Sequence, residues 1–310
     1  MTMKHAGYIA LPEHRGEGGF DHADIQVPSS RLYVAHTGND AVDVIDIEYD
    51  RYLESITGLT AVAGALVSEA RGLVFTSNRG ENTVSVFAPH AERGAFKIAV
   101  GVKPNGLAFD PARGTLIAAN VGDPEIADSH TVSVLDIARR ERIAEIKAPG
   151  RTRWAIYHPA LDMFFVNIAS PARIIAIDAR DPTKIAKAYE VPAAGPHGLD
   201  FDPATGRLLC ACDAGVLIAL DASSGRVLGE VPLSGGPDVI FLHPSMNRLY
   251  VAIGDPGVID VIDIGTMRRV ETVPTEAGAH TFALDRKRNK IYVFLPQSHR
   301  AAVFVDTNIQ

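Results

Sequence analysis

Three histidines and one aspartate, His22, His197, His280 and Asp238, stand near the start of equivalent strand-like segments in a pattern that recurs along the chain. Neutral imidazole nitrogens and carboxylate oxygens are common ligands of divalent metal ions, and three protein ligands leave a coordination position open for water or substrate. These residues are too far apart in the sequence to form a local motif. They can act together only if the fold brings them to one place.

The recurring pattern is a repeat of 41 to 48 residues. Its clearest copies are Asn105-Gly-Leu-Ala-Phe-Asp-Pro and His197-Gly-Leu-Asp-Phe-Asp-Pro, each followed by a second alternating apolar run. A β-propeller blade uses that length for four short strands and their turns. The leading residues of the seven copies are His22, Ala63, Asn105, Arg153, His197, Asp238 and His280. The sequence therefore predicts an all-β protein, a seven-bladed β-propeller with four antiparallel strands per blade, forming one domain over residues 1–310.

The last repeat stops after its third strand, at residues 301–306. An apolar run at residues 8–11 can supply the missing strand. We therefore expect the N-terminal strand to pair into the last blade, which would close the ring and remove exposed sheet edges.

Two runs, Asn78-Arg-Gly-Glu-Asn-Thr-Val-Ser-Val-Phe and Val102-Lys-Pro-Asn-Gly-Leu-Ala-Phe-Asp-Pro, resemble the repeats of YVTN-type, YncE-like seven-bladed propellers. The resemblance covers almost the whole chain, although Arg153-Trp154 departs from the pattern and no WD signature occurs. It implies the fold more than the function, because propellers include scaffolds, lactonases, lyases and redox enzymes. Gluconolactonase-like, streptogramin-lyase-like and peptidylhydroxyglycine-lyase-like propellers are similar in architecture and keep a metal at the channel.

In a propeller the first strand of each blade is innermost, so the leading residues form a ring at one end of the central channel. His197, Asp238, His280 and His22 then fall on four consecutive blades, because blade 7 adjoins blade 1. This arc predicts a divalent metal site, with zinc favoured and Mn, Fe, Cu, Ni or Ca as alternatives. The other interpretation is that the histidines only cap strands and bond to water in a polar channel.

The rest of the ring suggests a substrate side. Arg153 can hold a carboxylate, a phosphate or a developing oxyanion, with Asn105 beside it, but an ion pair with a channel acid is an alternative. Trp154 fits either the core or the wall of an apolar pocket. His130 ends the expanded loop at residues 121–130 and is a further candidate for substrate binding, although a solvated loop would also explain it.

His36 and His299 lie on loops that should open on the same face as the ring. An imidazole titrates near neutral pH, so these two residues and Arg153 are the candidate catalytic residues. The resulting hypothesis is a metal-dependent hydrolase of the lactonase or esterase kind, or a lyase, acting on a small anionic or carbonyl-bearing substrate. The alternative is a non-catalytic propeller that binds a ligand or a protein, and redox chemistry is a third possibility.

The composition of the chain argues against some classes of binding partner. The chain has a formal charge of -7 and a pI near 5.9, which disfavours binding to nucleic acid. It has no run of about 18 apolar residues and no basic segment followed by an apolar core near Met1, so we expect neither a membrane span nor a signal peptide. Cys210 and Cys212 are expected to be reduced core thiols of a cytoplasmic protein. The sequence leaves the oligomeric state open.

Overall fold

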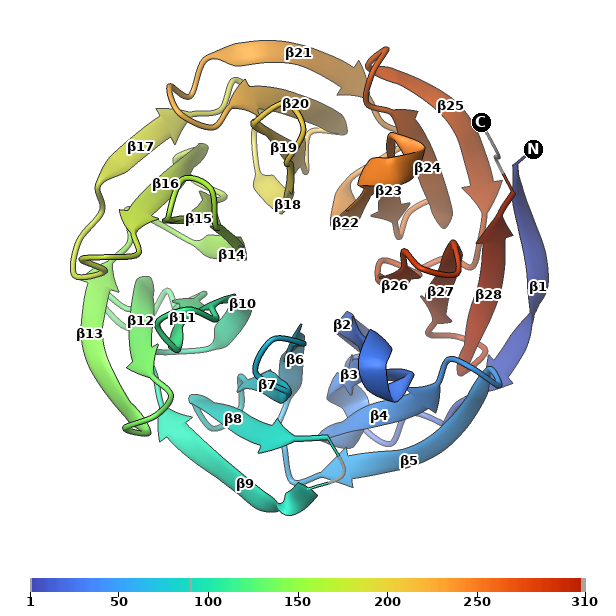
Figure 1. Cartoon of the computed structure of the whole chain (residues 1–310), viewed down its shortest axis with the longest axis horizontal. Coiled ribbons are helices and arrows are strands. Elements are labelled where there is room, and N and C mark those ends of the chain that lie inside the picture. Colours follow the sequence, from blue (N-terminus) through green and yellow to red (C-terminus); the bar gives the residue numbers. More distant parts are fainter. Residues whose placement is uncertain (1, 90, 308–310) are drawn as a thin grey trace.

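Seven four-stranded antiparallel sheets form a ring around a central axis in the computed structural model, which describes residues 2–89 and 91–307 (Figure 1). Within a blade, consecutive strands run from the channel to the outer edge. The strands of blades 1 and 2 are β2 (Phe20–Gln26), β3 (Arg31–His36), β4 (Ala41–Asp46), β5 (Arg51–Thr57), β6 (Val62–Ser68), β7 (Leu73–Asn78), β8 (Thr83–Ala88) and β9 (Ala91–Ala99). Those of blades 3 and 4 are β10 (Pro104–Asp110), β11 (Thr115–Asn120), β12 (Thr131–Asp136), β13 (Glu141–Lys147), β14 (Thr152–His158), β15 (Met163–Ile168), β16 (Arg173–Asp178) and β17 (Lys187–Glu190).

Blades 5 to 7 continue the same order. Their strands are β18 (Pro196–Asp202), β19 (Arg207–Cys212), β20 (Val216–Asp221), β21 (Val227–Pro232), β22 (Pro237–His243), β23 (Arg248–Ile253), β24 (Val258–Asp263), β25 (Arg268–Pro274), β26 (Phe282–Asp285), β27 (Lys290–Leu295), β28 (Arg300–Asp306) and β1 (Met3–Ala10). Three short 3-10 helices lie in loops: η1 (Val27–Ser29), η2 (Thr37–Asn39) and η3 (Pro244–Met246). The predicted all-β, seven-bladed fold is therefore confirmed.

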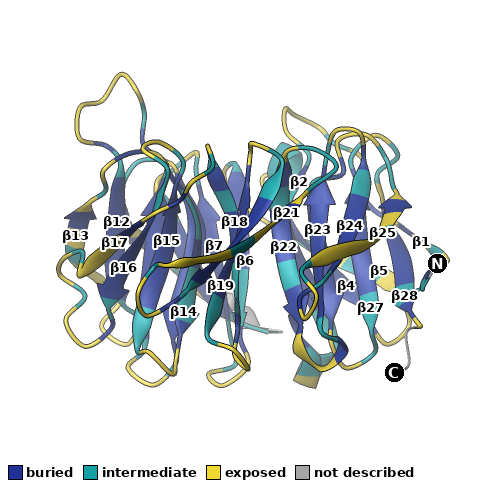
Figure 2. Ribbon diagram, turned by 90° about the horizontal axis from the view of Figure 1, so that it is seen from above, coloured by how far each residue is buried: buried dark blue, intermediate teal, exposed yellow. Residues whose placement is uncertain are grey.

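Burial follows the position of each strand in its blade. The second strands are nearly continuous apolar runs because both faces are covered by neighbouring blades, as in β23, where every residue is buried. The outermost strands have one face in water, so β21 and β25 are mostly exposed (Figure 2). The hydrophobic core therefore consists of clusters between adjacent blades, such as the one joining Val44 of blade 1 to Phe87 of blade 2.

The ring closes as predicted. Strand β1 pairs antiparallel with β28, from Met3 opposite Asp306 to Ala10 opposite Arg300. The two ends of the chain thus lie in one blade (Figure 1). Cys210 and Cys212 are buried free thiols, in agreement with the expected core role. No helix in the described residues has the length and apolar character needed to cross a membrane.

Candidate functional site

A bulge in the innermost strand places the leading residues at the channel. In blade 5, Pro196 is opposite Cys212 but Leu199 is opposite Cys210, so His197 and Gly198 lie within an irregular stretch of the register. The same irregularity occurs in the first strands of blades 1 to 6. Bulges of this kind re-aim side chains next to functional sites. We call the first bulge residues and their blade 7 equivalent the rim: Asp21, Ala63, Asn105, Arg153, His197, Asp238 and His280.

The prediction of His22 as the leading residue of blade 1 is wrong by one position. Phe20 is opposite His36 and Ala23 is opposite Val34, so Asp21 is the equivalent of His197, and His22 corresponds to Gly198. His22 is almost fully buried, with its Nε2 3.3 Å from Asp21 Oδ1. The difference arises because Pro28 follows the end of its strand one residue later than Pro203 does: Gln26 is opposite Arg31, and Asp202 is opposite Arg207. A match of the two prolines therefore displaces blade 1 by one residue.

His197 is the centre of a charged network on the rim. Its Nδ1 lies 2.7 Å from Asp213 Oδ1, and its Nε2 lies 3.1 Å from Asp238 Oδ1 and 3.2 Å from Arg153 Nη1. Burial alone would lower the pKa of His197, but the charges of Asp238 and Asp213 outweigh it and raise the pKa to about 9. His197 is therefore an imidazolium at neutral pH, held between two carboxylates.

Asp238 lies where the three predicted histidines converge. Burial tends to raise its pKa, but His197, His280 and His22 together hold the pKa well below its usual range. His280 uses its Nδ1 to contact Gly278 O at 2.7 Å. Both nitrogens of His197 face a carboxylate, so metal ligation would require breaking one of those contacts. In the described part of the chain, no three His, Cys, Asp or Glu side chains are grouped as they would be around a metal ion.

Arg153 and Asn105, the predicted substrate residues, also lie on the rim. Arg153 Nη2 is 3.4 Å from Asp213 Oδ2, so the predicted alternative of an ion pair with a channel acid is realised. Burial and the neighbouring Arg151 lower the pKa of Arg153. Arg153 Nε and Asn105 Oδ1 are buried and have no hydrogen-bond partner within the protein. Buried polar atoms are normally paired, so these two atoms are available to a polar ligand.

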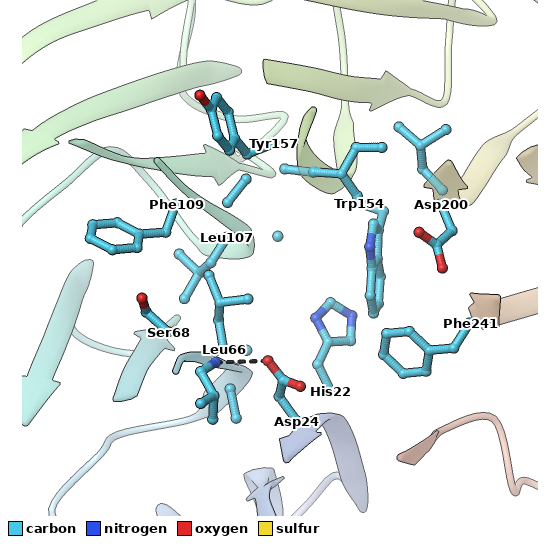
Figure 3. A pocket seen from close by; sticks show the side chains of 18 of the residues that line it. His22, Asp24, Leu66, Ser68, Leu107, Phe109, Trp154, Tyr157, Asp200 and Phe241 are labelled. Carbon is cyan, nitrogen blue, oxygen red and sulfur yellow. Dashed lines mark hydrogen bonds between the residues drawn. The ribbon is translucent and has the colours of Figure 1, made fainter. Parts of the chain in front are cut away.

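Trp154 and His22 divide the channel. Trp154 is on β14, and its indole packs against apolar residues of blades 5 to 7. The centroids of the Trp154 and His22 rings are 4.2 Å apart. Below these two side chains is a cavity of about 510 Å³, whose wall includes His22 and Trp154 but no rim residue (Figure 3). Trp154 therefore belongs both to the core and to a pocket wall, the two interpretations that its sequence left open. No sequence pattern predicted the cavity.

His36 and His299, the predicted acid or base residues, meet a third histidine that sequence reasoning missed. His36 is fully buried, with its Nδ1 2.7 Å from Asp43 Oδ2 and its Nε2 2.7 Å from His14 Nδ1. The His14 ring centroid is 4.5 Å from that of His299. His14 precedes the first blade, where no repeat equivalent could point to it. Catalytic roles for His36 and His299 remain predictions.

His130 closes its own loop. Its Nδ1 contacts Val121 O across the loop, and Asp123 in the same loop pairs with Lys103. Residues 124–128 are exposed. The structure thus gives His130 a loop-forming contact, and its predicted role in substrate binding remains a prediction.

Comparison with known proteins supports the fold alone. No family model and no curated protein matches this sequence. Among solved structures, the chain is similar to a chain of hydrazine synthase from Kuenenia stuttgartiensis, with a TM-score of 0.82 and 15% sequence identity. The match covers 94% of this chain and 96% of that chain. At 15% sequence identity the similarity shows a shared architecture and does not indicate the activity of this chain.

Proposed function

We propose that this protein is a YVTN-type propeller enzyme that acts on a small anionic or carbonyl-bearing molecule at the rim. The observation that carries the proposal is the imidazolium of His197, held between Asp213 and Asp238 and beside the guanidinium of Arg153. Two cationic donors fixed by carboxylates are preorganised to bind negative charge. The unpartnered atoms of Arg153 and Asn105 supply further contacts for a polar substrate.

The proposed chemistry is hydrolysis of an ester or lactone, or a lyase-type elimination. Arg153 would bind an anionic group or a developing oxyanion. His197, with its proton in place at neutral pH, would turn its Nε2–H from Asp238 to the leaving oxygen and donate that proton as the carbon–oxygen bond breaks. In hydrolysis a water molecule would add to the carbonyl carbon and release a proton to solvent; in elimination the carbon next to the breaking bond would lose its proton to solvent. Both reaction classes need this proton transfer, so the geometry supports them equally.

The metal-dependent form of this proposal is supported by the three imidazoles around Asp238. In the present arrangement each nitrogen of His197 lies near a carboxylate, so a metal could bind His197 only if one of these contacts broke. The metal content of the purified protein, compared with the His197→Ala and His280→Ala variants, tests it. About one equivalent of metal, lost in both variants, would support this form, and a wild-type protein that neither contains nor takes up a divalent metal would refute it.

A non-catalytic ligand-binding propeller is the second candidate. It is favoured by the fact that the two cations Arg153 and His197 are already balanced by the two carboxylates Asp213 and Asp238. In that case a ligand would bind at the rim without being converted.

The deciding experiment is a screen of lactones, esters and β-substituted carboxylates for both binding and turnover. We expect His197→Gln and Arg153→Ala to lower kcat/KM by roughly 10²-fold or more, as for loss of a general acid or an anion clamp. Exposed residues of the same types serve as controls: His5→Gln on β1 and Arg139→Gln on an outer turn should leave activity unchanged. Binding without turnover would favour the second candidate, and neither binding nor turnover would refute the rim as a site.

A further inference from the structure

The cavity below Trp154 and His22 is separate from the rim. Its wall includes Ser68, Ala70, Pro111 and Pro159, which belong to the ends of the first strands and the turns that follow them. Each first strand starts at the rim and ends at the opposite face of the propeller. The turns that follow the first strands therefore lie on that opposite face. The cavity therefore extends toward that face. Its volume of about 510 Å³ suits a small organic molecule.

Two partly buried carboxylates face this cavity from equivalent positions of two blades. Asp24 is on β2 and Asp200 is on β18, each three residues after the rim residue of its blade. Each accepts a backbone N–H from the next blade at 2.8 Å, Asp24 from Val67 and Asp200 from Leu242. These bonds join neighbouring blades, but they do not neutralise the charges.

Only one of the two carboxylates has a cation close by. Arg286 Nη2 lies 3.9 Å from Asp200 Oδ2, and the same guanidinium is 5.9 Å from the centroid of the Phe241 ring. Among the described residues, no ion pair joins Asp24 to a basic side chain. Burial raises the pKa of Asp24 to about 6, against the opposing effect of its backbone hydrogen bonds and Arg286.

The remaining wall is apolar and aromatic. Trp154, Phe241 and Phe201 line it, and each is partly exposed although it lies inside the ring, since it borders the cavity. Figure 3 shows Asp24 next to His22, with the Trp154 indole beyond it. An aromatic face together with a desolvated carboxylate is the arrangement that binds organic ammonium ions. The guanidinium of Arg286 is an example within the protein itself: it is a cation that lies near both a carboxylate, Asp200, and an aromatic ring, Phe241.

We propose that this cavity binds an apolar organic cation, an amine or quaternary ammonium compound, with its charged group beside Asp24 and its apolar body against Trp154. Anions are disfavoured, because three carboxylates in the wall (Asp24, Glu69 and Asp200) face one guanidinium (Arg286). The inference is independent of the proposed function, since the rim lies on the other side of Trp154 and His22. Loss of either site would leave the other in place.

The single tryptophan of the chain is a natural reporter for the test, because Trp154 is in the cavity wall. Its fluorescence would be titrated at pH 7.5 with phenyltrimethylammonium, with its neutral isostere tert-butylbenzene, and with the anion 4-tert-butylbenzoate. We expect saturable quenching by the cation, weaker quenching by the neutral compound, and none by the anion. Equal quenching by all three compounds, or no saturable quenching by the cation, would overturn the proposal.

Variants test the charge directly. Asp24→Asn keeps an acceptor for the Val67 N–H but removes the charge, so cation affinity should fall roughly tenfold or more, while binding of the neutral compound should not change. Arg286→Gln should tighten cation binding, and this gain keeps the test valid if Asp24→Asn fails to fold. Asp128→Asn, in an exposed loop, is the matched control. Unchanged cation affinity in both Asp24→Asn and Arg286→Gln would contradict the proposal.

Discussion

The imidazolium of His197 should make the stability of the propeller depend on pH in a specific range. Its pKa is about 9 in the folded protein, compared with about 6.5 for an unperturbed histidine. Because the pKa of His197 is higher in the folded protein than in the unfolded chain, protonated His197 stabilises the fold. This contribution is complete below pH 6.5 and is lost as the pH rises from 6.5 through 9. The difference of about 2.5 pH units corresponds to about 3 kcal/mol of unfolding free energy.

The His197 side chain is 14% exposed and that of Asp238 is 22% exposed, so water screens their contact weakly. Asp213 is 43% exposed and its contact is screened more strongly, so about 3 kcal/mol is an upper value. A chain of 310 residues unfolds with an entropy near 0.65 kcal/mol per kelvin, from a typical ~2.1 cal/mol/K per residue. A loss of about 3 kcal/mol should therefore lower the melting temperature by about 5 °C.

The assay is thermal unfolding of wild type and His197→Gln at several pH values between 6 and 9.5. General charge repulsion also grows with pH in a protein of net charge -7, so the comparison between the two proteins isolates His197. His5→Gln, an exposed histidine on β1, should follow the wild-type curve. If wild type and His197→Gln lose stability in parallel between pH 6.5 and 9, the assignment of an imidazolium held by Asp213 and Asp238 is incorrect.

Three further predictions concern the framework. Gly198→Ala should destabilise the protein by about 2 kcal/mol or more in urea unfolding, because the new Cβ would clash with the backbone oxygen of Asp238. Gly229→Ala, whose Cβ would have its nearest neighbour at 4.0 Å, should be close to neutral. Asp43→Asn should cost about 1 to 3 kcal/mol by the same assay, since buried His36 loses its charged partner; an unchanged midpoint would exclude that role. Deletion of residues 1–11 should expose the edge of β28 and cause self-association, measurable by light scattering, and a stable monomer would contradict it.

The fold could be predicted from sequence because each blade repeats the same alternation of apolar strands and turns, and seven copies reinforce one another. The fourth strand of the last blade could be assigned because only residues 8–11 remained to fill it. Rim residues Asn105, Arg153, His197 and Asp238 were placed correctly by the repeat.

The register of blade 1 could not be predicted from its proline, which lies one residue further from the strand end than the proline of blade 5. A stricter comparison of Gly19-Phe20-Asp21 with Gly195-Pro196-His197 would have selected Asp21. The contact between Trp154 and His22 could not be predicted, since it crosses the channel between blades far apart in the chain. The cavity could not be predicted either, because it depends on how completely side chains from different blades fill the axis of the propeller.

The pairing of β1 with β28 has a consequence for synthesis of the protein. The two strands are separated by about 300 residues, and a ribosome adds about 5 to 20 residues per second. Strand β1 therefore waits about 15 to 60 seconds for its partner. During that interval it is an unpaired strand that other chains could capture, and its own sequence opposes this with Lys4 and a register irregularity between His5 and Gly7, two features that discourage edge-to-edge pairing.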